Sequence, residues 1–322
     1  MSRKLLAVWV ALVCGLAQAA NYYWSGAGEN NRWDNVDNWA TDEALTKKAS
    51  AYPVGSDVVC LYTSSFSEHK ISILIPDGTQ CGFVYLYDNV APGTVVLTGE
   101  GTRPTFSHNG IYHKNQARQA DSGYGTEVDF VNLSLSRFPL GGVGNNTGND
   151  CRIVLDDCLC DCAGAQPTFY TTAGCSVEIR NSTVRNFTKL TRQASAIPFD
   201  LKILDSEISS SSYWYVTGND SSIVVSNSTI NLTGQFYFSG ASARLSFSET
   251  TINQQGSSAA MTITSDNGEV VFDHVNFTGE GSWGENKLQG QGMDTKFICS
   301  DIAFVQPYGF VQVPFGQFSV IG

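Results

Sequence analysis

A repeated eight-residue phrase is the feature that most constrains how this chain can fold. Each copy is apolar at its first, third and eighth positions. Residues of one class that return at a regular interval are the signature of a repeat architecture. The copies follow one another at a nearly constant interval and start at Val128, Ile153, Val177, Leu201, Ile223, Leu245, Val270 and Phe297.

The alternation inside the phrase predicts a short strand with one buried face. The fifth position is mostly Asn or Asp, which tolerate the left-handed backbone conformation of a sharp turn. We predict that these side chains stack as a ladder, with each amide bonded to the next. The fifth-position residues are Asn132, Asp157, Asn181, Asp205, Asn227, Glu249, His274 and Asp301.

A further apolar pattern precedes several phrases, as at Trp214 and Val216, and a glycine such as Gly218 follows it. Three short strands in each turn of about 24 residues predict an all-β fold, a single parallel β-helix whose coils pair with their neighbours. A leucine-rich repeat would need a Leu-x-x-Leu-x-Leu phrase, which is absent. An antiparallel sandwich would not place one residue class at the same position of eight successive units.

The composition agrees with this fold and excludes some partners. Only 15% of the 322 residues are charged, against the roughly 25% usual for globular domains. The formal net charge is -11. A chain without a basic stripe is not expected to bind nucleic acid, and it has no electrostatic attraction to anionic lipid.

The first twenty residues are expected to be a secretory signal peptide. Arg3 and Lys4 precede an apolar run from Leu5 to Leu16, and small residues follow at Ala17 and Ala19. The run is shorter than the roughly 20 residues of a membrane span. We therefore expect an exported, secreted or cell-surface chain without a transmembrane segment.

Eight of the nine cysteines remain after Cys14 leaves with the signal peptide, and an exported chain permits disulfides. Cys151 and Cys175 stand at the same place before adjacent phrases, so stacking puts them within bridging distance. Cys60 and Cys81, separated by nearly one repeat, are a second candidate pair between early coils.

The other cysteines are not assigned to bridges. Cys299 falls at an inward third position and is expected to be a buried thiol. The Cys158-x-Cys160-x-Cys162 run lacks the spacing of a zinc site. Alternation points Cys160 into the core and the other two elsewhere, and the pairing of the three stays open.

The phrase pattern over residues 126–306 resembles the right-handed parallel β-helix of pectin-lyase-like proteins. A second resemblance lies in the segments Tyr23–Gly26, Trp33–Trp39 and Pro53–Val59. They are similar to the Trp-x-Gly, Asn-Trp and Pro-x-Gly-Asp opening of bacterial surface and autotransporter-like β-helix proteins. These resemblances imply a solenoid at a bacterial surface, and neither implies a particular activity.

We divide the chain accordingly into a signal peptide (1–20), a cap segment (21–59), irregular early coils with a polar loop (60–125) and regular coils (126–322). A solenoid end exposes an apolar cross-section that a cap must cover. The tryptophans Trp24, Trp33 and Trp39 suit that role, and sugar binding is their less favoured alternative. Asn109 to Gly125, a polar stretch that also holds His113, is expected to loop out, and His108 is assigned to the same loop.

The working face of polysaccharide-cleaving β-helix enzymes corresponds here to the strand before each phrase. Its outward positions carry aromatic rings, hydroxyls and one amide, without a carboxylate or a base. Aromatic faces stack on the apolar faces of sugar rings, so a neutral glycan is the expected ligand if there is one. Simple pairing across the strands is the favoured alternative for the tyrosines. The candidate binding residues are Phe169, Tyr215, Thr217, Tyr237 and Ser239.

A charged cluster lies on the neighbouring strand, at Asp156, Glu178, Arg180 and Lys202. An acid beside a base is what a lyase needs. The signs alternate from coil to coil, which favours ion pairs of Asp156 with Arg180 and of Glu178 with Lys202 over catalysis.

The sequence therefore favours an exported, non-catalytic, adhesin-like or structural β-helix protein of a bacterial surface. No metal site and no cofactor are predicted, and the expected partner is a glycan or another surface protein. The alternative is a secreted protein that binds or degrades polysaccharide as a lyase or glycoside hydrolase.

Overall fold

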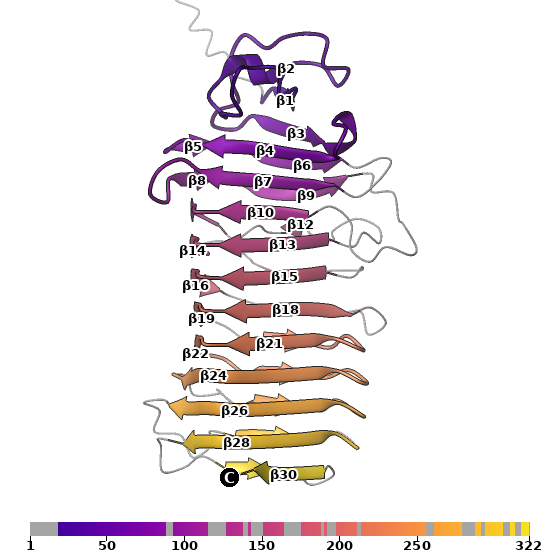
Figure 1. The fold of residues 1–322 in the computed structure, drawn as a ribbon, viewed down its shortest axis with the longest axis vertical. Helices are drawn as coiled ribbons and strands as arrows, with labels where there is room; N and C mark the ends of the chain where they lie inside the picture. The colour runs from indigo at the N-terminus through magenta and orange to yellow at the C-terminus, as the bar shows by residue number, and fades with distance from the viewer. Residues whose placement is uncertain are drawn as a thin grey trace, which may run out of the picture.

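Short strands stacked along one axis build the molecule, a parallel β-solenoid (Figure 1). The computed structural model describes residues 19–87, 93–114, 127–137, 141–142, 151–163, 175–187, 190–191, 198–210, 214–255, 261–278, 287–290, 294–304, 310–312 and 317–321. Among them no helix is long and apolar enough to cross a membrane. The two short 3-10 helices are η1 (Val36–Asn38) and η2 (Thr63–Ser65).

The largest sheet takes the first two strands of each coil. Along the solenoid the first strands are β4 (Lys70–Ile75), β7 (Thr94–Gly99), β10 (Glu127–Val131), β13 (Cys151–Asp156), β15 (Cys175–Arg180), β18 (Phe199–Leu204) and β21 (Ser222–Ser226). The second strands are β5 (Thr79–Gln80), β8 (Thr105–Ser107), β11 (Ser134–Leu135), β14 (Leu159–Asp161), β16 (Thr183–Phe187), β19 (Glu207–Ser210) and β22 (Thr229–Leu232). Longer strands take both places in the later coils, namely β24 (Arg244–Gln254), β26 (Glu269–Thr278) and β28 (Lys296–Phe304), and β30 (Gln317–Ile321) follows them.

The third strand of each coil belongs to one of two smaller sheets. The N-terminal one holds β6 (Phe83–Tyr87), β9 (Gly110–Lys114) and β12 (Gly141–Gly142) together with β1 (Asn21–Trp24), β2 (Trp39–Ala40) and β3 (Val58–Tyr62). The C-terminal one holds β17 (Leu190–Thr191), β20 (Trp214–Val216), β23 (Phe236–Phe238), β25 (Met261–Ile263), β27 (Lys287–Gly290) and β29 (Phe310–Gln312).

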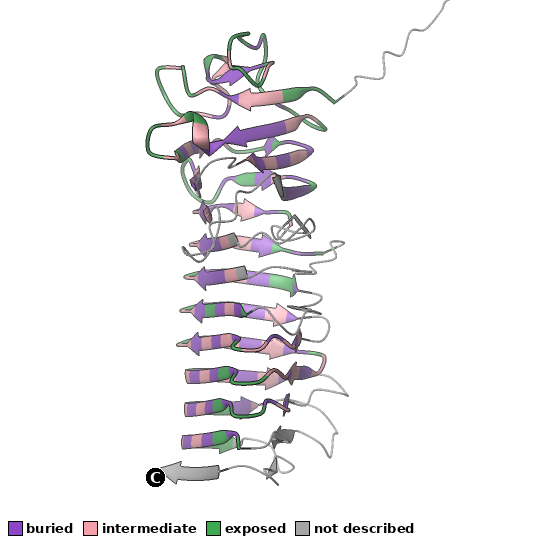
Figure 2. Cartoon of the chain, turned by 90° about the vertical axis from the view of Figure 1, so that its right-hand side faces the viewer, coloured by how far each residue is buried: buried purple, intermediate pink, exposed green. Residues whose placement is uncertain are grey.

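The predicted phrase register is confirmed. The first strands pair in parallel with equal phrase positions opposite each other, so the core is built from rows. One such row runs through the third positions Ile179, Ile203, Val225 and Phe247, all of them buried. Figure 2 shows buried residues alternating with half-buried and exposed ones along strands of the regular coils.

The turn after the fourth position is also as predicted. All eight fifth-position residues adopt the left-handed conformation, with φ between 46° and 54°. The expected amide ladder forms only in part. Asn227 donates from Nδ2 to Oδ1 of Asp205 at 2.6 Å, but Asn181 reaches Asp156 instead of Asp157, and Asn132 donates to the backbone carbonyls of Gly99 and Gly101.

A second ladder, made of serines, lies inside that turn and was not predicted. The hydroxyl oxygen of Ser182 accepts the backbone N–H of Cys158 at 3.0 Å. Ser206 does the same for Ser182, and Ser228 for Ser206, each at 3.1 Å. These sixth-position hydroxyls satisfy N–H groups that the left-handed turn removes from the strand ladder.

The predicted aromatic cap is confirmed as a buried cluster of packed tryptophan rings. Trp24, Trp33 and Trp39 are each at most 2% exposed, and their rings meet edge to face with centroids 5.0 Å apart. Trp33 also contacts Phe106 of the second early coil at 5.6 Å. The expected strands at 71–75 and 94–97 form within β4 and β7, which pair in register with each other and with β10.

Two expectations about the polar stretch are wrong. Asn109 to Gly125 begins with strand β9, and its part from residue 115 lies outside the described residues, as does the side chain of His113. His108 is 3% exposed and packs against the rings of Phe106 and Phe130. Its place is inward because it continues the alternation of β8, where Phe106 faces the core.

The cysteines depart from the predictions in part. Cys151 and Cys175 are register partners, as predicted, but their side chains lie outside the described set, so that bridge stays a prediction. The Cys60–Cys81 bridge is wrong, because both are buried free thiols and Cys60 lies opposite Tyr85. Cys299 is a buried free thiol, as predicted.

The expectation that Cys160 alone of its run faces the core is wrong. Cys158, Cys160 and Cys162 are all completely buried, and the Sγ atoms of Cys160 and Cys162 lie 3.8 Å apart. The left-handed residue Asp157 causes this, because alternation starts anew after the turn. The sixth, eighth and tenth positions then all point inward.

Candidate functional site

The third strands place two tyrosines side by side on the outer face of the C-terminal sheet. Tyr215 of β20 and Tyr237 of β23 are register partners, and their rings stack with centroids 4.6 Å apart and an interplanar angle of 23°. The strands are held by buried inward neighbours such as Trp214 and Phe236. The sequence positions the tyrosines outward because large apolar residues occupy the alternate inward positions.

Hydroxyl groups continue this surface, which we call the tyrosine strip (Tyr215, Thr217, Tyr237 and Ser239). All four residues are half-buried. Thr264 of the next coil donates from its hydroxyl to the Oη atom of Tyr237 at 2.9 Å. Phe169, the remaining predicted member, lies outside the described residues.

The strip offers hydrogen-bonding hydroxyls more than free ring faces. A ring face of Tyr215 is covered by Tyr237, as the cross-strand alternative predicts. The outer ring edges and the hydroxyl groups remain as the recognition elements. This arrangement suits contact with a polyhydroxylated or polar partner surface, and its strip residues contain no carboxylate or amine for acid–base chemistry.

The charged cluster on the first strands is an ion-pair network. Arg180 contacts Asp156 on the preceding coil at 3.0 Å, as predicted, and Glu178 on its own strand at 3.1 Å. The predicted Glu178–Lys202 pair is wrong, although these residues are register partners. Glu178 instead contacts Arg152 at 3.1 Å, and Arg152 also holds Glu127 at 3.2 Å.

Sequence reasoning missed Glu127, Asp129 and Arg152 in this network. Glu127 and Arg152 stand one residue before their phrases, and Asp129 occupies a second position. Alternation gives all three the same outward orientation as Glu178. Inspecting the position before each phrase would have found Glu127 and Arg152, and the second position of the first phrase would have found Asp129.

Asp129 has the most perturbed carboxyl group of the network. Burial, followed by the neighbouring Glu127 carboxylate, raises the pKa of Asp129 to about 6. Its Oδ1 atom is buried without a hydrogen-bond partner. Arg152 and Arg180 oppose the shift but are engaged by other carboxylates.

No group of three or more His, Cys, Asp or Glu side chains within the described ranges is arranged to hold a metal ion. Comparisons with protein-family models, with curated proteins and with solved structures found no match.

Proposed function

We propose that this chain is an exported β-helix protein of a bacterial surface that acts as a non-catalytic, adhesive or structural module. The single observation that carries the proposal is the tyrosine strip, in which Tyr215 and Tyr237 stack on the outside of a rod of coils. Export is supported by the expected signal peptide and by the resemblance to pectin-lyase-like and autotransporter-like proteins. The partner is a neutral glycan or another surface protein.

Two features of the strip favour binding over chemistry. Stacked rings lose little side-chain entropy on binding, because the sheet already fixes them. Hydroxyls such as that of Ser239 supply both donors and acceptors to a neutral partner. The ion-paired Arg180 supports the same interpretation, because a base that holds two carboxylates is poorly suited to take a proton.

A glycan array probed with the purified chain tests the proposal. Wild type is expected to bind neutral glycans, and the Tyr215→Ala, Tyr237→Ala double variant is expected to lose the signal of at least one of them. Lys202→Ser, an exposed change on the large sheet, is the matched control and should bind as wild type does. A double variant that keeps every glycan signal of wild type would exclude the strip as the adhesive surface.

The second candidate function is cleavage of an acidic polysaccharide, and Asp129 is the observation that favours it. A carboxyl group with a pKa near 6 is suited to donate a proton at neutral pH. Incubation with polyuronates would reveal it as new reducing ends or unsaturated products. Activity that Asp129→Asn abolishes would replace the adhesive proposal, and the adhesive proposal expects no turnover.

A further inference from the structure

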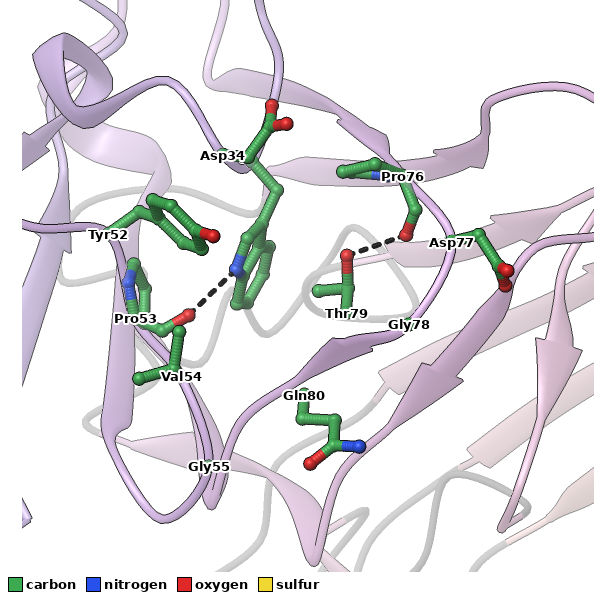
Figure 3. Close-up of a pocket in the computed structure, with 11 residues that line it drawn as sticks. Asp34, Tyr52, Pro53, Val54, Gly55, Pro76, Asp77, Gly78, Thr79 and Gln80 are labelled. Atoms are coloured by element: carbon green, nitrogen blue, oxygen red, sulfur yellow. Dashed lines mark hydrogen bonds between the residues drawn. The ribbon is translucent and has the colours of Figure 1, made fainter.

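A cleft opens between the cap and the first early coil. Two turns face each other across it, Pro53–Gly55 from the cap and Pro76–Gly78 after β4 (Figure 3). Its volume is about 220 Å³, and Trp33, Tyr52, Thr79 and Gln80 complete most of its lining. Segments that are far apart in the sequence therefore form one concave site.

The turns that form the rim have fixed backbone geometry. Gly55 and Gly78 have φ of 55° and 76°, which glycine adopts without strain. The indole N–H of Trp33 donates to the Pro53 carbonyl at 3.1 Å, and the Thr79 hydroxyl donates to the Pro76 carbonyl at 2.7 Å. These hydrogen bonds fix the conformation of both turns without a ligand.

The rim carries exposed apolar surface, which is rare in this molecule. Among the described residues, Tyr52 and Val54 are the exposed large hydrophobic side chains, at 39% and 54%. Most other tyrosine rings of the described surface stack on a neighbour, as Tyr62 does on Tyr87 at 4.2 Å. No ring of a described residue stacks on Tyr52, whose side chain lies exposed beside the cleft.

Polar side chains lie beside this apolar rim, namely Gln80, Asp34 and Asp77. Gln80 is exposed, and its side-chain amide has donors and acceptors for a ligand. Asp34 is held by the Arg32 guanidinium at 2.9 Å and 3.0 Å, which lowers its pKa. Asp77 accepts the backbone N–H of Thr105 at 2.8 Å, which also lowers its pKa.

The two carboxylates decide the charge of the ligand. Both are ionised at neutral pH, because their pKa values lie below the ordinary range of Asp. Arg32 pairs with Asp34 and also with Glu100, so this one cation does not balance the carboxylates around it, and an anionic ligand such as a uronate is disfavoured. A purely apolar ligand would displace water from the exposed Gln80 amide without replacing its hydrogen bonds.

We propose that this cleft binds a single ring of a neutral glycan. The apolar C–H face of the ring lies against Tyr52, whose aromatic body is apolar. The ring hydroxyls bond to the Gln80 amide. The carboxyl groups of Asp34 and Asp77 lie at the outer edge of the cleft and act on the ligand through their charge (Figure 3). The volume is below the usual range for drug-sized ligands, which limits occupancy to about one ring.

This site lies in the cap region and shares no residue with the tyrosine strip, so the two stand or fall separately. Calorimetric titration with neutral oligosaccharides (cellotetraose, laminaritetraose, maltotetraose and a mannotetraose) and with tetragalacturonate is the test. Wild type is expected to bind at least one neutral probe, at least about tenfold more tightly than the uronate.

Variants locate the binding. Tyr52→Ala is expected to weaken it at least tenfold, whereas Tyr52→Phe, which keeps the ring, changes it less than about threefold. The Tyr215→Ala, Tyr237→Ala double variant should retain it. Melting curves check the fold, which the exposed Tyr52 position leaves intact.

Three results would overturn the proposal. One is the absence of binding to every neutral probe, and another is equal binding of the uronate. The third is neutral-glycan binding that Tyr52→Ala leaves unchanged. A proline-rich peptide that binds the cleft while the sugars do not would assign it to a protein partner instead.

Discussion

Each residue of the phrase has its role set by whether it points into or out of the coil. Ile203 and Lys202 are neighbours in β18, yet the first is 1% exposed and the second is exposed. Alternation in the sequence predicted this difference, and the Asn and Asp residues at the fifth position predicted the left-handed turn. It could not predict the ion pairs of Glu178, because long side chains reach diagonally as well as directly across strands.

An inward residue should therefore be far more sensitive than its outward neighbour. Ile203→Asp buries a carboxylate without a partner and is expected to destabilise the fold by several kcal/mol. Lys202→Ser should change the melting temperature little, because an exposed charge contributes little to stability. Thermal melts of the two variants check this, and equal losses would show that the inward phase is misassigned.

His274 links three coils at the exposed turn. Its ring lies 2.9 Å from Asp273, 3.8 Å from Glu249 and 3.3 Å from Asp301, and these groups raise its pKa, Asp273 most of all. A raised pKa means that the folded state holds the proton more tightly. The stabilisation is complete below the unfolded value of about 6.5 and is lost as pH rises through the folded pKa.

His274→Asn should remove this pH dependence, because Asn suits the left-handed turn without titrating. Melting temperatures between pH 5 and pH 8 give the comparison. The excess stability of wild type over the variant should shrink as pH rises. If the stability of wild type relative to the variant grew with pH, the raised pKa of His274 would be contradicted.

His108 should behave in the opposite sense. Burial lowers its pKa to about 4, so the unfolded chain binds a proton that the folded chain excludes. Stability should fall as pH decreases from about 6.5 to about 4. His108→Leu should flatten this part of the pH profile, and an unchanged slope would show that other groups cause it.

At the scale of the elements, the turn joins the first and second strands through buried hydroxyls. Ser182, Ser206 and Ser228 each accept a backbone N–H of the preceding coil, in addition to the strand pairing. The sequence contains these serines at equal positions, but the signal is weak because Leu, Cys, Thr, Val and Ile occupy the same position elsewhere. The inward orientation of Cys158 and Cys162 after the turn at Asp157 was also missed, because no single residue class marks the sixth position.

Removing one hydroxyl from this ladder should be costly. Ser206→Ala leaves the backbone N–H of Ser182 buried without its acceptor, which is expected to cost about 1–3 kcal/mol. Ser246→Ala, at a half-buried outward position, is the control and should have little effect. Denaturant titration measures both, and a Ser206→Ala variant as stable as the control would show that the ladder is unimportant.

At the scale of the whole molecule, the repeat predicted the stacked coils of the β-solenoid, and the tryptophans of the N-terminal segment predicted its cap. The tyrosine strip was also predicted, because Tyr215 and Tyr237 stand at equal positions of adjacent coils. The cleft was not, because its walls come from the cap and from the turn after β4, which no repeat relates. Its shape depends on how the cap packs on the first coil, which has no periodic signal in the sequence.

The central claim is that each phrase adds one coil to a single rod. Ser134 and Ala303 are connected through seven register steps, by way of Leu159, Thr183, Glu207, Thr229, Thr251 and Asn276. At about 4.8 Å for each step, their Cα atoms should lie about 34 Å apart. Ser134→Cys and Ala303→Cys provide attachment points for spin labels.

A pulsed electron–electron resonance measurement between these labels tests the claim most directly. The native thiols in the described part of the chain are buried, so the unsubstituted chain is the labelling control. The rod predicts one dominant distance close to the sum of the seven strand spacings, broadened by the label arms. A dominant distance of half that sum or less, or of one and a half times that sum or more, would contradict the stacking of one phrase in each coil.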